Sequence, residues 1–381
     1  MSRDGIAIWG HRLTEAREIR GLTMPELAQK IGKTKQTISY YENGTVNPSP
    51  ATLNDICEAL SLPAAFFTVE RIDAEIINRP VFYRSMKSAL LKQRKQTIRW
   101  LQWIVNRVTL YNKYLDFPKV QLPYSQTEWR NLELDDIETV AENTRAAMGL
   151  GHGPISNLTL LLENNGIIVV HYDLGKKELD ACSTIVGGRP IILINTYRAT
   201  CSRVLMDLAH ELGHILLHSS IEGEELANDD TYKLIESQAW RFASSFLLPA
   251  DSFAAEIVDT RLSSFAQLKR RWRVSIAAMI MRCYDLMIVD DYRKTFLFTE
   301  MSRQHMRAKE PYDDILEIER PRSLFNADNE IMRNSILSKY QLLEDSYLSP
   351  NDYEQIIGAD DSYFNEVIIR PKLRPQLKIV K

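Results

Sequence analysis

Residues 208–218 read "LAHELGHILLH", and this stretch, here called the HELGH helix, guides the interpretation of the whole chain. Positions four apart lie on one face of a helix, so His210 and His214 can direct two imidazole nitrogens toward one ion. Glu211 lies about 100° further round the axis, within reach of a water on that ion. Zinc lowers the pKa of such a water to about 7, and a glutamate can take its proton. The spacing favours a metal-dependent hydrolytic site over the alternative, a structural helix with satisfied histidines.

His218 repeats the four-residue spacing but is a poor candidate for the third ligand. It lies about 12 Å along the helix from His210, whereas zinc–nitrogen bonds are about 2 Å long. We expect His218 to lie beside a ligand or to act as a cation at the helix end.

The third ligand is predicted in the next helical stretch, residues 232–247. Glu236 falls inside an apolar arc of that helix, and a buried carboxylate is costly unless it is paired or binds a metal. Small Ala239 and Ala243 would let the two helices approach closely, whereas Gln238 is predicted to face the other way. A group of acidic residues before this helix competes on composition but has loop character: Glu222, Glu224, Glu225, Asp229 and Asp230.

Upstream of the HELGH helix the pattern changes from helical to strand-like. Helical periodicity at about 133–148 and 155–164 is followed by two β-rich runs, "NNGIIVVHYDL" (164–174) and "GGRPIILINTY" (187–197). Pro190 suits an edge strand, which could hold an extended peptide through backbone hydrogen bonds. An interior strand is equally compatible with this run.

The first seventy residues are punctuated into four or five short helices. Thr23 and Glu26 form a capping box, and Gly32 separates that helix from a second, polar one. Two short helices joined by a glycine-containing turn are typical of a helix-turn-helix, whose second helix enters the DNA major groove. The residues predicted to contact DNA are Lys33, Lys35, Gln36, Thr37, Ser39 and Tyr40. The alternative is a small helical bundle with a solvated polar face.

Composition sets outer limits on the function. The chain has 381 residues, which is too long for one ordinary core, and its net charge of −3 excludes a uniformly basic nucleic-acid-binding protein. The four cysteines are far apart, which fits a reducing compartment. No apolar run reaches the roughly 20 residues of a membrane helix. We therefore expect a cytoplasmic protein without a membrane partner.

The stretch between Glu75 and Asp116 contains no acidic residue but many basic ones, with tryptophans and aliphatic residues among them. A long amphipathic helix is predicted there. Its basic face could contact phosphates or pair two protomers, but charge runs usually form a solvated face, and we favour that interpretation over DNA contact. The basic residues are Arg79, Arg84, Lys87, Lys92, Arg94, Lys95, Arg99, Arg107 and Lys113.

The C-terminal third contains one clear pattern. "LKRRWRVSIAAMIMRCYDL" (268–286) predicts two helices with a break near Val274 and Ser275. It could be a second DNA-binding motif, but we prefer a helical completion of the preceding domain. From about residue 311 a small helical accessory segment is expected, ending in the basic "RPKLRPQLKIVK".

Two resemblances bring these motifs together. "LTMPELAQKIGKTKQTISYYENGTVNPSPATLNDICEAL" resembles the Xre/Cro-type helix-turn-helix family, which implies a five-helix domain that binds palindromic operators as a homodimer. Met24 stands where that family often has a polar residue that touches phosphate, which weakens one contact.

"GGRPIILIN", "HELGHILLH" and "ESQAWRFASSFLLP" resemble the ImmA/IrrE family of zinc metallopeptidases, over roughly residues 125–310. That resemblance implies a minimal zincin-type fold in which His210, His214 and Glu236 bind Zn²⁺ and Glu211 is the general base. It also implies cleavage of DNA-binding repressors, and some members carry an N-terminal Xre-type domain. Trp240 stands where the family often has asparagine, so the role of that asparagine is not transferred.

The predicted fold is α+β and multidomain. An all-α helix-turn-helix bundle is followed by a zincin-like domain with a small sheet, and then by a mostly helical C-terminal segment. The expected divisions are a DNA-binding domain at 8–68, a basic helical linker at 69–120, a peptidase domain at 121–310 and an accessory segment at 311–381.

The expected function is that of a DNA-binding regulatory zinc metalloendopeptidase. Its expected partners are a double-stranded operator and a protein substrate, which is a repressor encoded nearby or the chain itself. One alternative is a transcription regulator that uses the zincin fold for sensing or dimerisation without proteolysis. A further alternative is an antitoxin-like partner protein.

Overall fold

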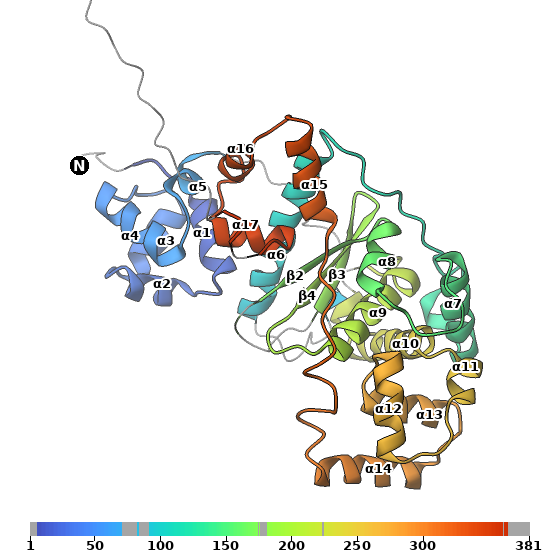
Figure 1. Cartoon of the computed structure of the whole chain (residues 1–381). Coiled ribbons are helices and arrows are strands. Elements are labelled where there is room, and N and C mark those ends of the chain that lie inside the picture. The colour runs from blue at the N-terminus through green and yellow to red at the C-terminus, as the bar shows by residue number, and fades with distance from the viewer. Residues whose placement is uncertain are drawn as a thin grey trace, which may run out of the picture.

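The computed structural model describes residues 6–70, 82–83, 91–173, 175, 181–222, 225–360 and 362–364. On one side of a small sheet lie the helix over residues 91–111 and the C-terminal helices, and the N-terminal group of helices lies beyond them (Figure 1). Further helices cover the other side of the sheet. The C-terminal helices lie beside the N-terminal group. This arrangement confirms the predicted α+β class, with a helical region at each end and a small sheet between them.

The N-terminal helices begin and end where local sequence signals predict. The capping box of α2 is present, because Thr23 N donates to Glu26 Oε2 over 2.6 Å and Glu26 N donates to Thr23 Oγ1 over 3.4 Å. Leu13 and Ala16 are fully buried on the inner face of α1. The helices are α1 (Gly10–Ile19), α2 (Met24–Lys30), α3 (Lys35–Glu42), α4 (Pro50–Leu60) and α5 (Ala64–Thr68).

The strands form one sheet in the order β1-β3-β4-β2. β2 and β4 run parallel, and β3 pairs antiparallel with β4. β3 and β4 form a hairpin through Gly187 and Gly188, whose φ angles of 56° and 79° suit the tight turn. The strands are β1 (Phe82–Tyr83), β2 (Ile168–Tyr172), β3 (Ala181–Val186) and β4 (Arg189–Asn195).

The two predicted strands exist as β2 and β4, but the edge-strand interpretation of "RPIILIN" is wrong. β4 lies between β3 and β2, so both of its edges are paired. Pro190 is tolerated there because it stands at the second position of the strand, opposite Ile185 near the hairpin turn. β3, which sequence analysis did not predict, lies nearer the sheet edge.

Alternate residues of the sheet belong to different hydrophobic cores. Ile192 and Ile194 pack with α8 (Leu158–Asn164) and α9 (Cys201–Leu217). Ile191 and Leu193 share a core with α6, the C-terminal helices and the N-terminal helices. The sheet is therefore covered on both faces, and its second face connects it to the helix-turn-helix region.

Helix α6 (Leu91–Tyr111) is the predicted long amphipathic helix, and its apolar side packs within the fold. Its Trp100 and Trp103 are buried, and the Trp100 ring lies 5.8 Å from that of Tyr172 on β2. The basic residues at its start stay partly exposed but form ion pairs with the N-terminal helices: Lys92 with Glu26, and both Lys95 and Arg99 with Glu18. Arg79, Arg84 and Lys87 lie outside the described residues.

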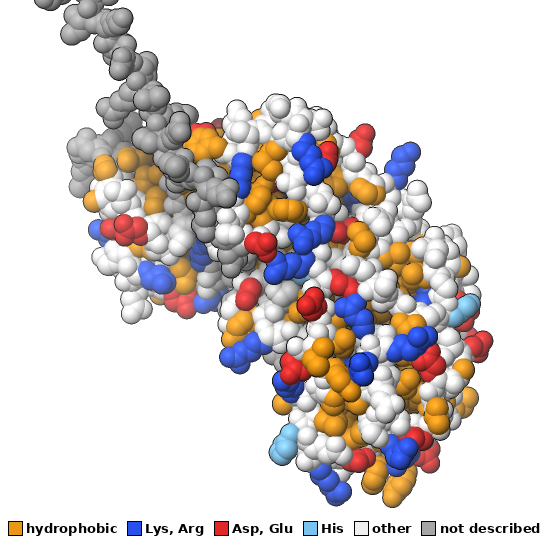
Figure 2. Space-filling view, viewed as in Figure 1, with side chains coloured by type: hydrophobic (Ala, Val, Ile, Leu, Met, Phe, Trp, Pro, Cys, Tyr) orange, Lys and Arg blue, Asp and Glu red, His pale blue; other side chains and the backbone are white. Residues whose placement is uncertain are grey.

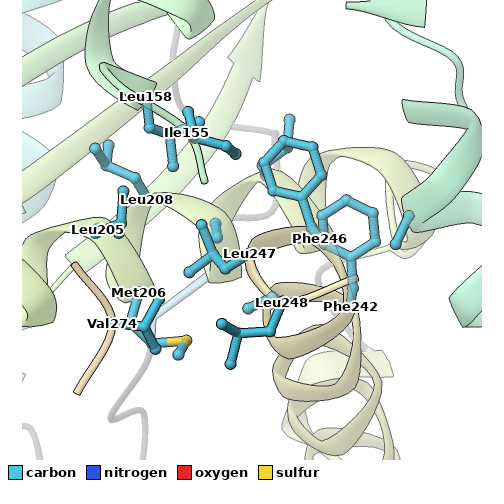
Figure 3. Packing of buried hydrophobic residues seen from close by; sticks show 14 of the residues in the cluster. Ile155, Leu158, Leu205, Met206, Leu208, Phe242, Phe246, Leu247, Leu248 and Val274 are labelled. Carbon is cyan, nitrogen blue, oxygen red and sulfur yellow. The ribbon is translucent and has the colours of Figure 1, made fainter. Parts of the chain in front are cut away.

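Helices on the first face of the sheet build the larger core. Figure 3 shows side chains of α8, α9 and α10 (Asp229–Leu247) meeting there, with the stacked rings of Phe242 and Phe246 centred 5.6 Å apart. Val274, between α12 and α13, belongs to the same core. This supports the interpretation that residues 268–286 complete the preceding domain and do not form a second DNA-binding motif. The remaining elements on this side are η1 (Trp129–Asn131), α7 (Leu134–Ala147), η2 (Glu225–Ala227), α11 (Ala250–Ala255), α12 (Leu262–Trp272), α13 (Ile276–Asp285) and α14 (Asp291–Arg303).

The C-terminal helices join the helix-turn-helix region to the rest of the chain. They are α15 (Ser323–Arg333), α16 (Lys339–Glu344) and α17 (Pro350–Ile357). Asp352 on α17 binds Arg20 in a two-pronged ion pair with distances of 2.6 Å. Asp328 on α15 accepts hydrogen bonds from Tyr111 of α6 and Tyr353 of α17. The basic end "RPKLRPQLKIVK" lies outside the described residues.

The surface carries both signs of charge. Figure 2 shows Lys and Arg side chains interspersed with Asp and Glu over the face in view, as the net charge of −3 implies. Across the described ranges, no helix is both long enough and apolar enough to cross a membrane.

Candidate metal centre

Helix α9 carries the HELGH residues deep in the larger core. It is capped by Thr200, whose side chain accepts from Arg203 N, and it continues to Leu217. His210, Glu211 and His214 are completely buried. These three polar side chains of the helix are therefore shielded from bulk water.

Gly213 brings α10 close to α9. A Cβ at this position would lie 3.0 Å from Phe242 Cδ1 and 3.3 Å from Ala239 Cα, so only a glycine fits without displacement. The predicted close approach at the small residue Ala239 is thus present. It places Glu236, one turn before Ala239 on α10, opposite the two histidines.

The three predicted ligand side chains meet at one point. His210 Nε2 and His214 Nε2 are 3.1 Å apart, Glu236 Oε1 lies 3.3 Å from His214 Nε2, and Glu236 Oε2 lies 3.5 Å from His210 Nε2. A tetrahedral ion with bonds of about 2.0–2.1 Å separates its ligand atoms by about 3.3 Å. The spacing and the donor set of two imidazoles and a carboxylate therefore fit zinc.

The charge of Glu236 also suits a cation ligand. Burial raises the pKa of this carboxyl, but the adjacent His210 and His214 outweigh burial and lower the pKa to about 2. Glu236 is therefore ionised at neutral pH, and its side chain is 15% exposed. Two of the acidic residues that competed with it on composition pair elsewhere: Glu225 with Arg130, and Asp230 with Lys233 at the surface. Glu224 lies outside the described residues. Within the described parts of the chain, His210, His214 and Glu236 are the group that can hold a metal ion.

Glu211 contacts a residue that sequence analysis missed. Ser183 of β3 donates a hydrogen bond of 2.5 Å to Glu211 Oε2, and both side chains are fully buried. The unpredicted strand β3 thus orients the candidate base. If the sequence before "RPIILIN" had been recognised as its hairpin partner, that strand would have pointed to Ser183.

His218 lies beside a ligand rather than in the ligand set. Its Nδ1 is 3.0 Å from His214 Nδ1, on the opposite side of that ring from the ligand atom Nε2. Its Nε2 is 2.9 Å from Oε1 of Gln238, which is buried and so does not face away as predicted. The reason is that α10 packs against α7 as well as α9, so α10 has two buried faces. Burial also lowers the pKa of His218 well below its usual value.

The comparison with known families assigns two regions of the chain. Residues 162–284 match the family model of the IrrE N-terminal-like domain, and residues 13–67 match that of the helix-turn-helix. The chain joins these two domains. No curated protein matches the chain. The IrrE N-terminal-like match runs from within α8 to the end of α13, and so includes β2–β4, α9 and α10. This finding confirms the resemblance to the ImmA/IrrE and Xre-type families and gives the domain a metallopeptidase-type fold.

A cleft opens beside the centre of the IrrE N-terminal-like domain. Its volume is about 800 Å³, and it lies between α9, α10, α13 and α14. Trp240, which replaces the family's frequent asparagine, lines it and packs its ring 4.5 Å from that of His210. Met206, Met281 and Met301 supply much of its apolar wall. Trp240 thus lies between the cleft and His210, and the cleft itself offers an adaptable apolar surface.

In the helix-turn-helix domain, the second helix has the two faces that groove binding needs. Ile38 and Tyr41 of α3 are buried. Gln36 and Tyr40 lie on the outer face, where Gln36 Nε2 donates to Tyr40 Oη over 2.5 Å. The predicted DNA contacts all avoid the core: Lys33, Lys35, Gln36 and Tyr40 are exposed, and Thr37 and Ser39 are half-buried.

Proposed function

We propose that this chain is a DNA-bound zinc metallopeptidase that cuts a transcription repressor. The observation that carries the proposal is the triangle of ligand atoms from His210, His214 and Glu236, with Glu211 buried alongside. A helix-turn-helix match in the same chain supports a substrate that is itself found on DNA.

The residues divide the chemistry between them. His210, His214 and Glu236 would hold Zn²⁺, which when bound supplies an acidified water and polarises the scissile carbonyl. Glu211 takes a proton from the attacking water and returns it to the leaving amine. Ser183 holds the carboxylate of Glu211 in one orientation through its hydrogen bond. The packing of Trp240 against His210 limits water on the cleft side.

The substrate is proposed to bind as an extended strand along β3. β3 carries Ser183 beside the base, and in the described part of the chain its outer edge pairs with β1 at Cys182 and Ser183. An added strand would be held by backbone hydrogen bonds, as in other cases of β-augmentation. Side chains of the peptide would then reach the cleft lined by methionines.

The test compares cleavage by three zinc-loaded proteins. Wild type, Glu211→Gln and Glu142→Gln are each incubated with a lysate of cells lacking the gene, and new protein N-termini are identified by mass spectrometry. Glu142 is exposed on α7 and serves as the matched control. We expect wild type and Glu142→Gln to create the same new N-terminus in a helix-turn-helix protein, or in this chain itself, and Glu211→Gln to create none. Identical products from all three would refute the proposal.

A regulator without proteolysis is the second candidate, because the DNA-binding region shares a core with the back of the sheet. In that case occupancy of the metal site would alter DNA affinity, and Glu211→Gln would regulate as wild type does. DNA binding by wild type and Glu211→Gln, with and without zinc, separates the two candidates.

We also propose the division of the chain at residues 8–68, 69–120, 121–310 and 311–381, and binding of a palindromic operator as a homodimer. The core that α6 shares with the N-terminal helices and the sheet supports a 69–120 segment whose helix is packed against both neighbours. Sedimentation of the full chain, alone and with operator DNA, tests the dimer. A single chain on each operator would contradict it.

A further inference from the structure

A line of hydrogen bonds runs from the metal centre to a backbone carbonyl. His214 Nδ1 lies 3.0 Å from His218 Nδ1, and His218 Nε2 lies 2.9 Å from Gln238 Oε1. Gln238 Nε2 then donates to the carbonyl oxygen of Trp129 over 2.7 Å. His214, His218 and Gln238 are at most 3% exposed. The line joins α9 and its C-cap to α10 and η1.

The carbonyl at the far end fixes the direction of every bond. A backbone carbonyl only accepts, so Gln238 must turn its NH₂ group toward Trp129 and its oxygen toward His218. The amide oxygen also only accepts, so His218 must carry its proton on Nε2. A neutral imidazole with its proton on Nε2 presents a lone pair at Nδ1, which faces His214.

The same logic determines which nitrogen of His214 can bind a metal. Because His218 Nδ1 accepts, His214 must donate from its own Nδ1, which leaves the lone pair on Nε2. Nε2 is the atom that faces His210 Nε2 and Glu236 Oε1. Hydrogen bonds of this kind to the second ring nitrogen of a ligand histidine hold its tautomer and ring orientation.

We propose that Gln238 and His218 are positioning residues that hold His214 in its metal-binding tautomer, anchored by the carbonyl of Trp129. The inference rests on the proposed zinc site but not on proteolysis. Removing the relay is expected to weaken zinc binding about 10–100-fold, the usual effect of losing a partner of a ligand histidine. If His218 and Gln238 only held the helices together, their replacement would lower the stability of the metal-free protein and leave the zinc affinity unchanged.

The experiment measures the zinc dissociation constant of the full chain by competition with a chelator, together with the melting temperature of the metal-free protein. The relay is broken in Gln238→Leu and in His218→Phe. Gln96→Leu is the matched control, because Gln96 is a buried glutamine whose Nε2 also donates to a backbone carbonyl, that of Ile19, over 2.8 Å. His218→Asn retains a side-chain acceptor for His214.

We expect the dissociation constant to rise about 10–100-fold in Gln238→Leu and His218→Phe, and to stay near the wild-type value in Gln96→Leu and His218→Asn. Wild-type zinc affinity in both relay-breaking variants would overturn the proposal, as would equal losses in His218→Asn and His218→Phe. If His214→Ala also binds zinc as tightly as wild type, the proposed zinc site itself is wrong, which is a separate failure.

A second measurement needs no variant. Nitrogen-15 chemical shifts of the histidines in the zinc-loaded full chain report which ring nitrogen of each histidine carries a proton. The relay predicts a proton on Nδ1 of His214 and on Nε2 of His218. A His218 ring that carries its proton on Nδ1 would overturn the proposal.

Discussion

Ser183 on β3 donates a hydrogen bond of 2.5 Å to Glu211 on α9, although the two residues are 28 positions apart in the sequence. The contact links the candidate base directly to the strand proposed to bind the substrate. A hydrogen bond to a charged group contributes about 1.5–3 kcal/mol. A peptide that displaces or shifts β3 would therefore also shift Glu211.

Ser183→Ala is expected to lower kcat at least about tenfold, the effect of about 1.4 kcal/mol, while the zinc content stays at the wild-type level. Ser183 touches the base and no ligand atom, so only the proton transfer should suffer. Kinetics with the cleaved substrate, alongside elemental analysis, check this. An unchanged kcat would show that the hydrogen bond does not orient Glu211.

Gly213→Val should separate α9 from α10, because the space beside Gly213 is filled by Phe242 and Ala239. Overpacking of this kind costs about 1–3 kcal/mol, and the displacement of α10 also moves Glu236 away from the histidines. We expect a lower unfolding free energy and weaker zinc binding. Gly151→Val is the control, because a Cβ at Gly151 meets nothing within 4 Å. Equal behaviour of the two variants would contradict the account of this helix contact.

Asp352→Asn should loosen the joint between the helix-turn-helix region and the C-terminal segment. Asp352 forms an ion pair with Arg20, and the side chain of Asp352 is 2% exposed whereas that of Arg20 is 23% exposed. We expect a loss of about 1–3 kcal/mol in the free energy of unfolding, measured by denaturant titration. Arg20→Ala combined with Asp352→Asn should cost less than the sum of the single changes. Strict additivity would mean that the pair contributes nothing.

His171 should make stability depend on pH. Burial, with a smaller contribution from Arg320, lowers its pKa from 6.5 to about 4, so the unfolded chain takes up the proton more readily than the folded one. The stability is complete above pH 6.5 and is lost as the pH falls toward about 4. His171→Phe should show a smaller loss across this window, measured by unfolding at a series of pH values. Replacement of the exposed His152 by asparagine is the control. Parallel curves for His171→Phe and wild type would contradict the prediction.

Gln36→Ala should weaken binding to the preferred operator by about 1–3 kcal/mol and relax the sequence preference, because a glutamine amide can read adenine. Lys33→Ala should weaken binding to all sequences alike and reduce its salt dependence, as loss of a phosphate contact does. Selection from random DNA followed by affinity measurements at several salt concentrations distinguishes the two effects. A shared, sequence-independent loss would place α3 outside the major groove.

Local signals made much of the fold predictable from the sequence. The capping box at Thr23 and the Ser49–Pro50 start of α4 depend on residues within one turn, and the structure has both. The convergence of Glu236 with the histidines was also predictable, because a carboxylate in an apolar arc requires a partner.

Features that depend on distant residues were not predictable. The partners of the basic residues of α6 are one example, because Lys95 and Arg99 pair with Glu18, more than seventy positions away. β3 has the sequence "ACSTIV", which lacks the alternation of a half-buried strand because its first four residues are all buried. Because β3 was not predicted, neither the interior position of β4 nor the contact of Ser183 with Glu211 could be predicted. The burial of Gln238 was not predicted, because a helical wheel does not show that α10 has a second buried face.

The central claim is that the HELGH helix and Glu236 form a zinc site with a separate base. Elemental analysis of purified wild type, His214→Ala, Glu236→Ala and Glu211→Gln tests it most directly. The account predicts one zinc per chain in wild type and in Glu211→Gln, and loss of zinc in the two ligand variants. A wild-type protein that binds no zinc, or ligand variants that retain it fully, would contradict the account.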